Sequence, residues 1–268
     1  MKIQLLGTGA SDGIPSVFGD SRVSRHARQH GGKDIRSRSA ALIDDHLKID
    51  LGPDHFHQMV KFGVDPTIWT AIVFTHTHDD HFCPSELQYM LFPFLEQFAA
   101  PLTIYGNDAI CQGMAGKYEE WPFEIIQTKS FEPFWHLDYK ITPIRAYHKL
   151  EEDSQNLLIE REGKTFLYAT DTGPWQPITW EFLQDKKVDG VVIECTDGFV
   201  KSSYYGHMDL KECVAAVEKL RELGCIGQET PVATTHHGHL GDATHEELCL
   251  ALEPHGIQTG YDGLVIQI

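Results

Sequence analysis

A dense run of histidine and aspartate is the part of the sequence best equipped for chemistry. Residues 75–81 contain the pattern HxHxDH, which places four metal-ligand side chains within six positions directly after the apolar segment 69–75. Imidazole and carboxylate groups bind zinc, manganese or iron better than calcium or magnesium. The four side chains are those of His76, His78, Asp80 and His81. We therefore predict a metal site here, with Asp80 also serving catalysis.

Three further residues lie after other apolar segments and can complete this site. His148 follows segment 139–144, Asp171 follows 165–169, and His236 follows 231–235. Alone, a His or Asp after a strand is as often a turn residue as a ligand. Four ligands cannot complete two metal sites, so the HxHxDH run and these three residues support one another.

Apolar segments of strand length alternate with amphipathic segments along the chain. Strands are predicted over 3–6, 39–43, 47–51, 69–75, 102–105, 139–144, 156–159, 165–169, 190–194, 231–235 and 263–268, and helices over 84–94, 178–184, 210–223 and 245–252. The aromatic stretch 89–95 is expected to pack in the core, with the wall of a substrate pocket as the alternative. No repeat or linker interrupts the pattern, so we expect one α/β domain over residues 1–268, with the polar groups at strand ends.

Composition limits the classes of protein that fit. The chain has 268 residues, 41% hydrophobic and 23% charged, and a formal net charge of -17, which disfavours undirected binding to nucleic acid or an anionic membrane. The first apolar run is too short for a signal peptide, and no apolar segment has bilayer length, so a cytoplasmic protein is expected. Six cysteines without a CxxC pair disfavour a thiolate zinc site.

Segments spread along the chain resemble the metallo-β-lactamase superfamily, and in particular its phosphoribosyl 1,2-cyclic phosphate phosphodiesterase branch. They are GTGASDGIP near the start, HxHxDH, IDLG at 49–52, TDTG at 170–173, GHMDL at 206–210, TTHHGH at 234–239 and YDGL at 261–264. The resemblance implies a four-layer αβ/βα sandwich with two divalent metal ions, zinc or manganese, with iron as a further option.

The resemblance also implies a role for each candidate residue. One metal would be held by His76, His78 and His148, the other by Asp80, His81 and His236, with Asp171 bridging the two ions. Asp50 of the IDLG turn would orient ligands without needing to touch metal. His207 of GHMDL would be a catalytic residue that acts on the leaving group. A surface histidine in a flexible stretch is the alternative for His207.

The chain departs from that branch in its N-terminal loop. The branch can use a CxCxxC loop and the last histidine of TTHHGH for a structural zinc, but Gly19, Ser21 and Ser24 occupy the cysteine positions here. We therefore expect that zinc to be absent, which leaves the role of His239 open. The rebuilt loop 22–38 is basic, and Arg36, Arg38 and His239 are the candidates for substrate binding. A solvated insertion is the competing interpretation of the loop.

Together, the motifs and the resemblance predict a binuclear metal-dependent hydrolase. The favoured activity is a phosphodiesterase that acts on a small cyclic or nucleotide-like phosphate ester through a metal-bound hydroxide, with His207 assisting the departing oxygen. A tRNA 3′-processing nuclease and an ester or lactone hydrolase on the same site are the alternatives, and a non-enzymatic metal-binding module is a further one. We expect a small-molecule substrate, no membrane or nucleic-acid partner, and an assembly for which a homodimer stays open.

Overall fold

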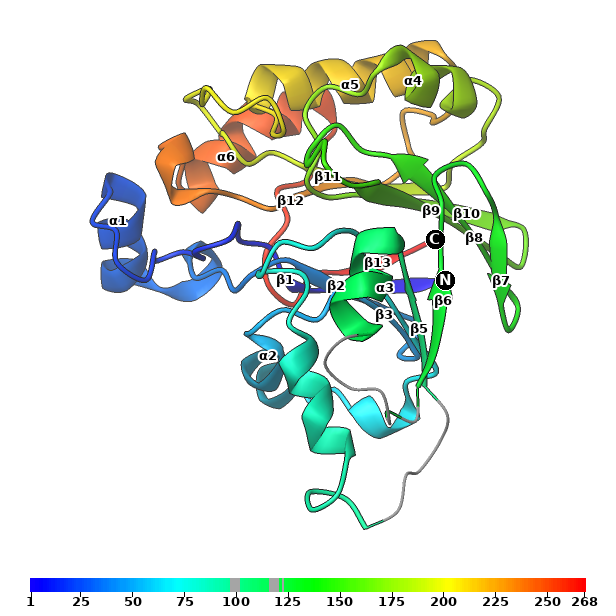
Figure 1. Ribbon diagram of the computed structural model, residues 1–268. Helices are drawn as coiled ribbons and strands as arrows, with labels where there is room; N and C mark the ends of the chain where they lie inside the picture. The colour runs from blue at the N-terminus through cyan, green and yellow to red at the C-terminus, as the bar shows by residue number, and fades with distance from the viewer. Residues whose placement is uncertain (97–101, 116–120, 122) are drawn as a thin grey trace.

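Two β-sheets packed face to face form the centre of the molecule, with helices on both outer surfaces (Figure 1). The computed structural model describes residues 1–96, 102–115, 121 and 123–268. The layers therefore run helix, sheet, sheet, helix, and this confirms the predicted four-layer sandwich.

The first sheet has seven strands in the order β13-β1-β2-β3-β4-β5-β6. Strands β3 to β6 run parallel to one another, whereas β13, β1 and β2 pair antiparallel. Its members are β1 (Lys2–Gly7), β2 (Ala40–Ile43), β3 (Leu47–Ile49), β4 (Ala71–Val73), β5 (Thr103–Gly106), β6 (Glu124–Gln127) and β13 (Val265–Gln267).

The second sheet has six strands in the order β12-β11-β10-β9-β8-β7. Its members are β7 (Phe134–His136), β8 (Tyr139–Arg145), β9 (Gln155–Arg161), β10 (Lys164–Ala169), β11 (Gly190–Glu194) and β12 (Val232–Thr235). Because β10, β11 and β12 are parallel, their carboxyl ends meet at one edge of this sheet.

Helices cover the outer faces of both sheets. The first sheet is covered by α2 (His55–Phe62), α3 (Asp108–Ala115) and the 3₁₀ helix η3 (Pro84–Met90), and the second by α4 (Pro177–Leu183), α5 (Leu210–Glu222) and α6 (His245–Leu252) (Figure 1). A further helix, α1 (Arg22–His30), lies to one side. The shorter 3₁₀ helices are η1 (Gly32–Asp34), η2 (Pro66–Ile68), η4 (His239–Gly241) and η5 (Glu253–His255). Helices α5 and α6 begin with capping boxes, in which Asp209 pairs with Glu212 and Thr244 with Glu247.

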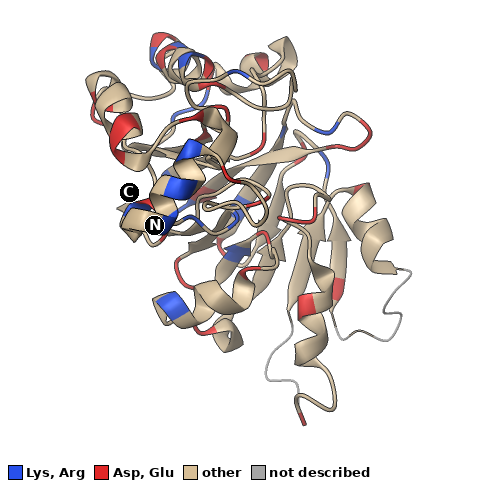
Figure 2. Ribbon diagram, turned by 90° about the vertical axis from the view of Figure 1, so that its left-hand side faces the viewer, with Lys and Arg blue, Asp and Glu red and all other residues tan. Residues whose placement is uncertain are grey.

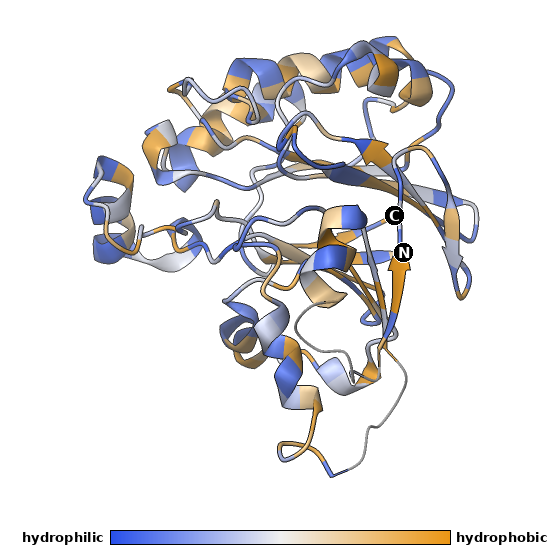
Figure 3. Cartoon of the chain, viewed as in Figure 1, coloured by the Kyte–Doolittle hydropathy of each residue, from blue (hydrophilic) through white to orange (hydrophobic). Residues whose placement is uncertain are grey.

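Apolar side chains form three buried layers that join these elements. One layer lies between the second sheet and α4 to α6, one between the two sheets, and one between the first sheet and its helices. Figure 3 shows the hydrophobic colouring concentrated on the strands, with mixed colouring on the helices. The central layer is the only one of the three built from both sheets, and it fixes one sheet relative to the other.

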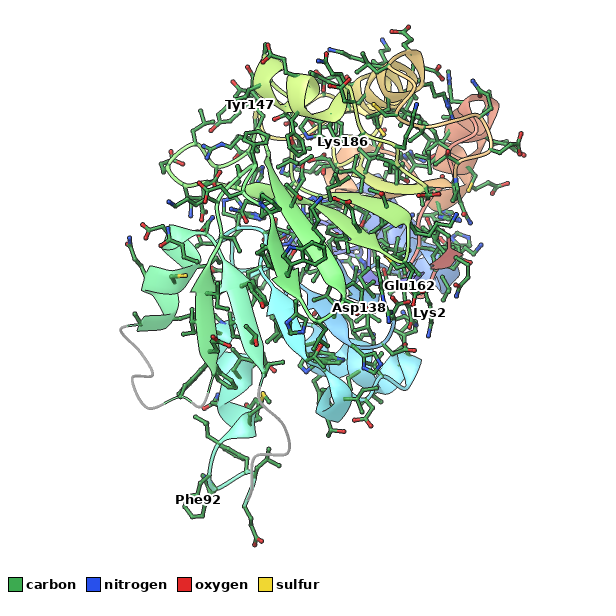
Figure 4. All side chains as sticks on the ribbon, turned by 90° about the vertical axis from the view of Figure 1, so that its right-hand side faces the viewer. Lys2, Phe92, Asp138, Tyr147, Glu162 and Lys186 are labelled. Atoms are coloured by element: carbon green, nitrogen blue, oxygen red, sulfur yellow. The ribbon has the colours of Figure 1, made fainter. Side chains whose placement is uncertain are left out.

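The predicted helices 178–184, 210–223 and 245–252 are confirmed within one residue at each end, but the helix predicted over 84–94 is wrong. Here the structure has only η3, followed by a segment that protrudes with Phe92 near its tip (Figure 4). Pro93 cannot continue a helix and disfavours helical geometry in the residue before it. The expectation that stretch 89–95 packs in the core is also wrong, because Tyr89 is 51% and Phe92 85% exposed.

Within the described part of the chain, no helix is both long and apolar enough to cross a lipid bilayer. The longest helix among the described residues, α5, has 13 residues.

The layer beneath α4 to α6 gives a prediction about stability. Leu167 of β10 is fully buried in that layer, so Leu167→Ala should lower the free energy of unfolding by about 2–5 kcal/mol through lost burial and a new cavity. The matched control is Ile178→Ala in α4, where the side chain is 56% exposed and the change should stay within about 0.5 kcal/mol. Urea unfolding followed by circular dichroism measures both. Equal effects for the two variants would contradict the assigned packing.

Candidate metal centre

The structure brings all seven sequence-predicted ligand residues together in two adjoining groups. The first group is His76, His78, His148 and Asp171, and the second is Asp80, His81, Asp171 and His236. Within each group the potential ligand atoms all lie within 4.8 Å of one another. Asp171 belongs to both groups, so the partition is the one that the family resemblance implies.

The side chains arrive from loops at the ends of strands in both sheets. The HxHxDH run follows β4 of the first sheet, while Asp171 follows β10 and His236 follows β12 of the second. Asp171 and His236 both have left-handed backbone, with φ of 47° and 56°. This conformation costs a non-glycine residue about 1–3 kcal/mol, and such strain is concentrated at functional sites.

Hydrogen bonds behind the rings aim their other nitrogens inward. The Nδ1 of His148 donates to the Gly206 carbonyl at 2.8 Å, so its Nε2 carries a lone pair. That Nε2 lies 2.9 Å from the Nδ1 of His78, which lies 3.0 Å from the Nε2 of His76. At most one hydrogen can lie between two ring nitrogens, whereas one cation can accept a lone pair from all three rings.

The second group is arranged in the same way around carboxylate oxygens. The Nε2 of His81 lies 3.0 Å from an oxygen of Asp80 and 3.0 Å from one of Asp171. The Nε2 of His236 lies 3.1 Å from Asp171, and its Nδ1 pairs with the Thr196 hydroxyl at 2.9 Å. Nitrogen and oxygen donors therefore converge on a second point beside the first.

The protonation states of these groups suit a divalent cation. Burial, together with neighbouring histidines, lowers the pKa of His76 well below its ordinary value and that of His148 to about 4, so both rings are neutral. Burial alone would raise the pKa of Asp80 and Asp171, but the adjacent histidines outweigh it and hold both well below the ordinary range. Burial lowers the pKa of His81, yet three surrounding carboxylates raise it overall, so this position attracts positive charge. Neutral imidazoles with ionised carboxylates are the donor set of zinc, manganese and iron sites.

Asp50 supports the second group from behind. Its fully buried carboxylate accepts a hydrogen bond from the Nδ1 of His81 at 2.7 Å and others from the amide and hydroxyl of Thr75. This is the placement expected of an orienting aspartate. The buried ammonium of Lys48 donates to the carbonyls of Ile49 and Asp50 and so holds this turn, where Asp50 has a φ of 56°. Burial lowers the pKa of Lys48 to about 7.

His207 lies against both candidate ligand groups and is held by Glu194, a residue that was not predicted from the sequence. Its ring stacks on His236 at 5.2 Å and tilts against His148 at 4.9 Å between ring centroids. Its Nδ1 donates to Glu194 at 2.9 Å, and Glu194, which is fully buried, also accepts from the amides of Thr172 and Met208. Burial would lower the pKa of His207, but the charge and hydrogen bond of Glu194 raise it to about 9. The sequence does contain a signal for Glu194, because it is a carboxylate at the end of the otherwise apolar segment GVVIE.

The three candidate substrate-binding residues have internal partners and lie outside both ligand groups. Arg36 is 3% exposed, and its guanidinium donates to the Thr8 hydroxyl at 2.8 Å and the Gly260 carbonyl at 2.7 Å. Arg38 forms an ion pair with Asp54 at 2.9 Å. These contacts favour a structural role for both arginines over the predicted contact with substrate.

His239 has a similar internal role. Its Nδ1 pairs with the Ser21 hydroxyl at 2.9 Å, and its Nε2 lies 2.9 Å from an oxygen of Asp12. Gly19 lies so close that an added Cβ would meet the His239 ring at 2.9 Å. Ser21 and Gly19, which align with two of the family's cysteines, are thus both adjacent to His239. Ser21 contacts the ring through its hydroxyl, and Gly19 has no side chain there.

The basic loop forms α1 and is neutralised by neighbouring acids. Arg22 pairs with Asp242 and Glu247 at 2.8 Å, and Arg25 and Arg28 pair with Asp20. Figure 2 faces this side of the molecule and shows the basic residues of α1. The pairings favour the solvated-insertion interpretation of this loop over a phosphate-binding one.

Comparison with solved structures agrees with the fold. A structure described as a new diphosphatase from the PhnP family superposes with a TM-score of 0.79 at 24% identity, covering 100% of this chain and 97% of that one. Zn²⁺-bound PqqB from Methylobacterium extorquens superposes with a TM-score of 0.77 at 14% identity, with both chains covered completely.

Comparison with sequences reaches the same family. A curated relative, an octanoyltransferase of Porphyromonas gingivalis, is 25% identical in an alignment that covers 98% of this chain and 51% of that protein. The chain thus spans about half the length of this relative. The family model described as the beta-lactamase superfamily domain matches residues 47–247, which is most of the chain. The chain therefore belongs to the beta-lactamase superfamily, and this confirms the family predicted from its sequence.

Proposed function

We propose that the protein is a binuclear phosphodiesterase that hydrolyses a small cyclic or nucleotide-like phosphate ester. The observation that carries this proposal is the position of His207, which packs against a ligand residue of each group while Glu194 holds its Nδ1. Hydrolysis of a phosphodiester expels an alkoxide that needs a proton, and His207 is placed to supply one.

Two divalent ions fit the residues present. His76, His78 and His148 would hold one ion, Asp80, His81 and His236 the other, and Asp171 would contribute to both. When bound, the ions would polarise the phosphoryl oxygens and activate a water molecule as nucleophile. Because the ligands come from both sheets, we also infer that residues 1–268 work as a single domain.

The protein's own groups then act on the leaving side of the reaction. Glu194 accepts a hydrogen bond from the Nδ1–H of His207 and fixes the ring, which leaves the Nε2 to deliver a proton to the departing oxygen. The carboxylate of Asp80 lies beside His81 and His236, on the side of the site where the nucleophile would be held, and would help to orient it. Lys149 lies beside the first group, with its ammonium on the Thr77 hydroxyl and 3.1 Å from a carboxylate oxygen of Glu152, which balances its charge.

Metal content and activity should be lost together when a ligand is removed. Purified protein should contain two metal ions per chain and hydrolyse bis(p-nitrophenyl) phosphate, and chelation should abolish an activity that zinc or manganese restores. His78→Ala should bind less metal and lose activity by at least about 10-fold. His57→Ala, at an exposed histidine, is the control and should behave as wild type. Full metal and full activity in His78→Ala would refute the assigned site.

Loss of the orienting carboxylate should weaken metal binding without removing a ligand. We expect Asp50→Ala to lower metal affinity by about 10–100-fold, because the His81 ring loses the partner that fixes its tautomer. Competition with a chromogenic chelator measures this, and a melting curve of the metal-loaded protein checks folding. An unchanged affinity would mean that Asp50 supports the backbone alone.

The role of His207 should depend on the leaving group. His207→Ala should lower kcat by about 10²–10⁴-fold for a diester with an alkyl leaving group, and by less for p-nitrophenolate, which departs without a proton. Metal content should stay at two ions, and His255→Ala, an exposed histidine, should leave both rates unchanged. Lactone hydrolysis that exceeds diester hydrolysis and survives His207→Ala would instead favour the ester or lactone hydrolase.

A further inference from the structure

We propose that Tyr147, Tyr204 and Tyr205 form a subsite that binds a flat ring, so that the substrate is a phosphate ester bearing a nucleobase or a similar aromatic group. We call these three residues the tyrosine row. This inference rests on the proposed phosphodiesterase function and specifies its substrate class.

The tyrosine row begins at the catalytic groups and leads away from them. Tyr204 lies 5.4 Å from His207 and 5.5 Å from His148 between ring centroids. Tyr205 is 4.9 Å from Tyr204, and Tyr147 is 5.0 Å from Tyr205. A substrate whose phosphate reaches His207 therefore has aromatic surface directly beside it.

The rings are partly exposed, although their surroundings hold them in place. Tyr204 is 36% and Tyr205 37% exposed, which is high for rings so close to a buried polar cluster. Tyrosine offers a rigid apolar face at a low cost in conformational entropy, and aromatic faces stack with any base. Exposed and ordered rings beside a reaction centre fit a role in binding better than a role in the core.

Close backbone packing orders the three loops that carry the row. A Cβ on Gly206 would lie 2.6 Å from the Tyr204 ring, and one on Gly173 would lie 1.9 Å from the Tyr205 carbonyl oxygen. The amide of Gly173 donates to the carbonyl of Tyr147 at 2.8 Å, and the Tyr204 hydroxyl donates to the His148 carbonyl at 3.3 Å. The row, whose Tyr147 is labelled in Figure 4, is therefore fixed to loops that also carry His148, Asp171 and His207.

Substrates that differ only in the ring test this subsite. Wild-type protein should hydrolyse a nucleoside 2′,3′-cyclic phosphate with a kcat/KM about 5–150-fold above that for ribose 2,3-cyclic phosphate, mainly through KM, which is the range expected for stacking one base. In the double variant Tyr204→Ala/Tyr205→Ala the ratio of the two kcat/KM values should fall to about one, whatever the absolute rates. Metal content and a melting curve check that the variant is folded and loaded with metal.

Two further variants separate stacking from other roles of the loop. Tyr204→Phe/Tyr205→Phe keeps the ring faces and should keep the preference. Phe199→Ala removes a 48% exposed ring from the same loop, away from the row's ring contacts, and should also keep it. Equal kcat/KM values for the two substrates in wild type, or a preference that survives the double alanine variant, would overturn the proposal.

Binding measurements distinguish failure of this inference from failure of the proposed function. If neither cyclic phosphate is hydrolysed, the phosphodiesterase assignment fails, but the tyrosine row still predicts tighter binding of adenosine monophosphate than of ribose 5-phosphate. Calorimetry with the metal-containing protein should show this difference in wild type and its loss in Tyr204→Ala/Tyr205→Ala. Equal affinities in wild type would exclude the ring subsite whatever the reaction.

Discussion

The buried carboxylate of Asp171 is the constraint on which the rest of the site depends. It is 3% exposed and lies between 3.0 and 3.9 Å from ring nitrogens of four histidines, which are His76, His81, His148 and His236. A carboxylate taken out of water needs compensating positive charge or hydrogen bonds close by. Here the compensating groups come from both sheets, so the two sheets must keep a fixed relative position at this edge. The apolar layer between the two sheets fixes their relative position. The polar cluster around Asp171 therefore depends on packing that lies outside the cluster.

Parallel pairing in the second sheet explains how distant parts of the sequence reach one edge. Strands β10, β11 and β12 deliver Asp171, Glu194 and His236 at their carboxyl ends. The same geometry holds His207 at this edge, because Glu194 at the end of the middle strand accepts a hydrogen bond from its Nδ1. Left-handed backbone at Asp171 and His236 turns each side chain toward the cluster, and the hydrogen bonds and ion pairs around it hold that strain.

Much of the fold and of the metal-ligand set could be predicted from the sequence, because each rests on a local pattern. The strands with short apolar runs and the helices α4 to α6 were recognisable, and so was HxHxDH after a strand. Strands β6 and β7 and helices α1 to α3 were not predicted. The segment of α1 was interpreted from its basic charge as a loop, although its buried Val23 and Ala27 lie four residues apart. The prediction that Arg36 and Arg38 contact substrate rested on residue type and loop position. Arg36 looks like a phosphate ligand by type and loop, and only the three-dimensional structure shows its guanidinium buried against Thr8 and Gly260. Glu194 and the tyrosine row were not predicted, because their candidate roles depend on contacts with residues distant in the sequence.

Selection of the proposed phosphate ester must come from short-range contacts, since the overall charge of the chain opposes an anion. The chain carries a formal net charge of -17, and the arginines of α1 are paired with acids, so long-range attraction of an anion is weak. At the site itself two divalent ions would outweigh the ligand carboxylates, and that positive charge acts on any phosphate ester alike. Discrimination between esters therefore requires groups that contact the part of the substrate beyond the phosphate. Tyr204 lies next to His207 and Tyr205 next to Tyr204, and both rings combine exposure with fixed position, so the proposed subsite would make recognition depend more on ring surface than on charge.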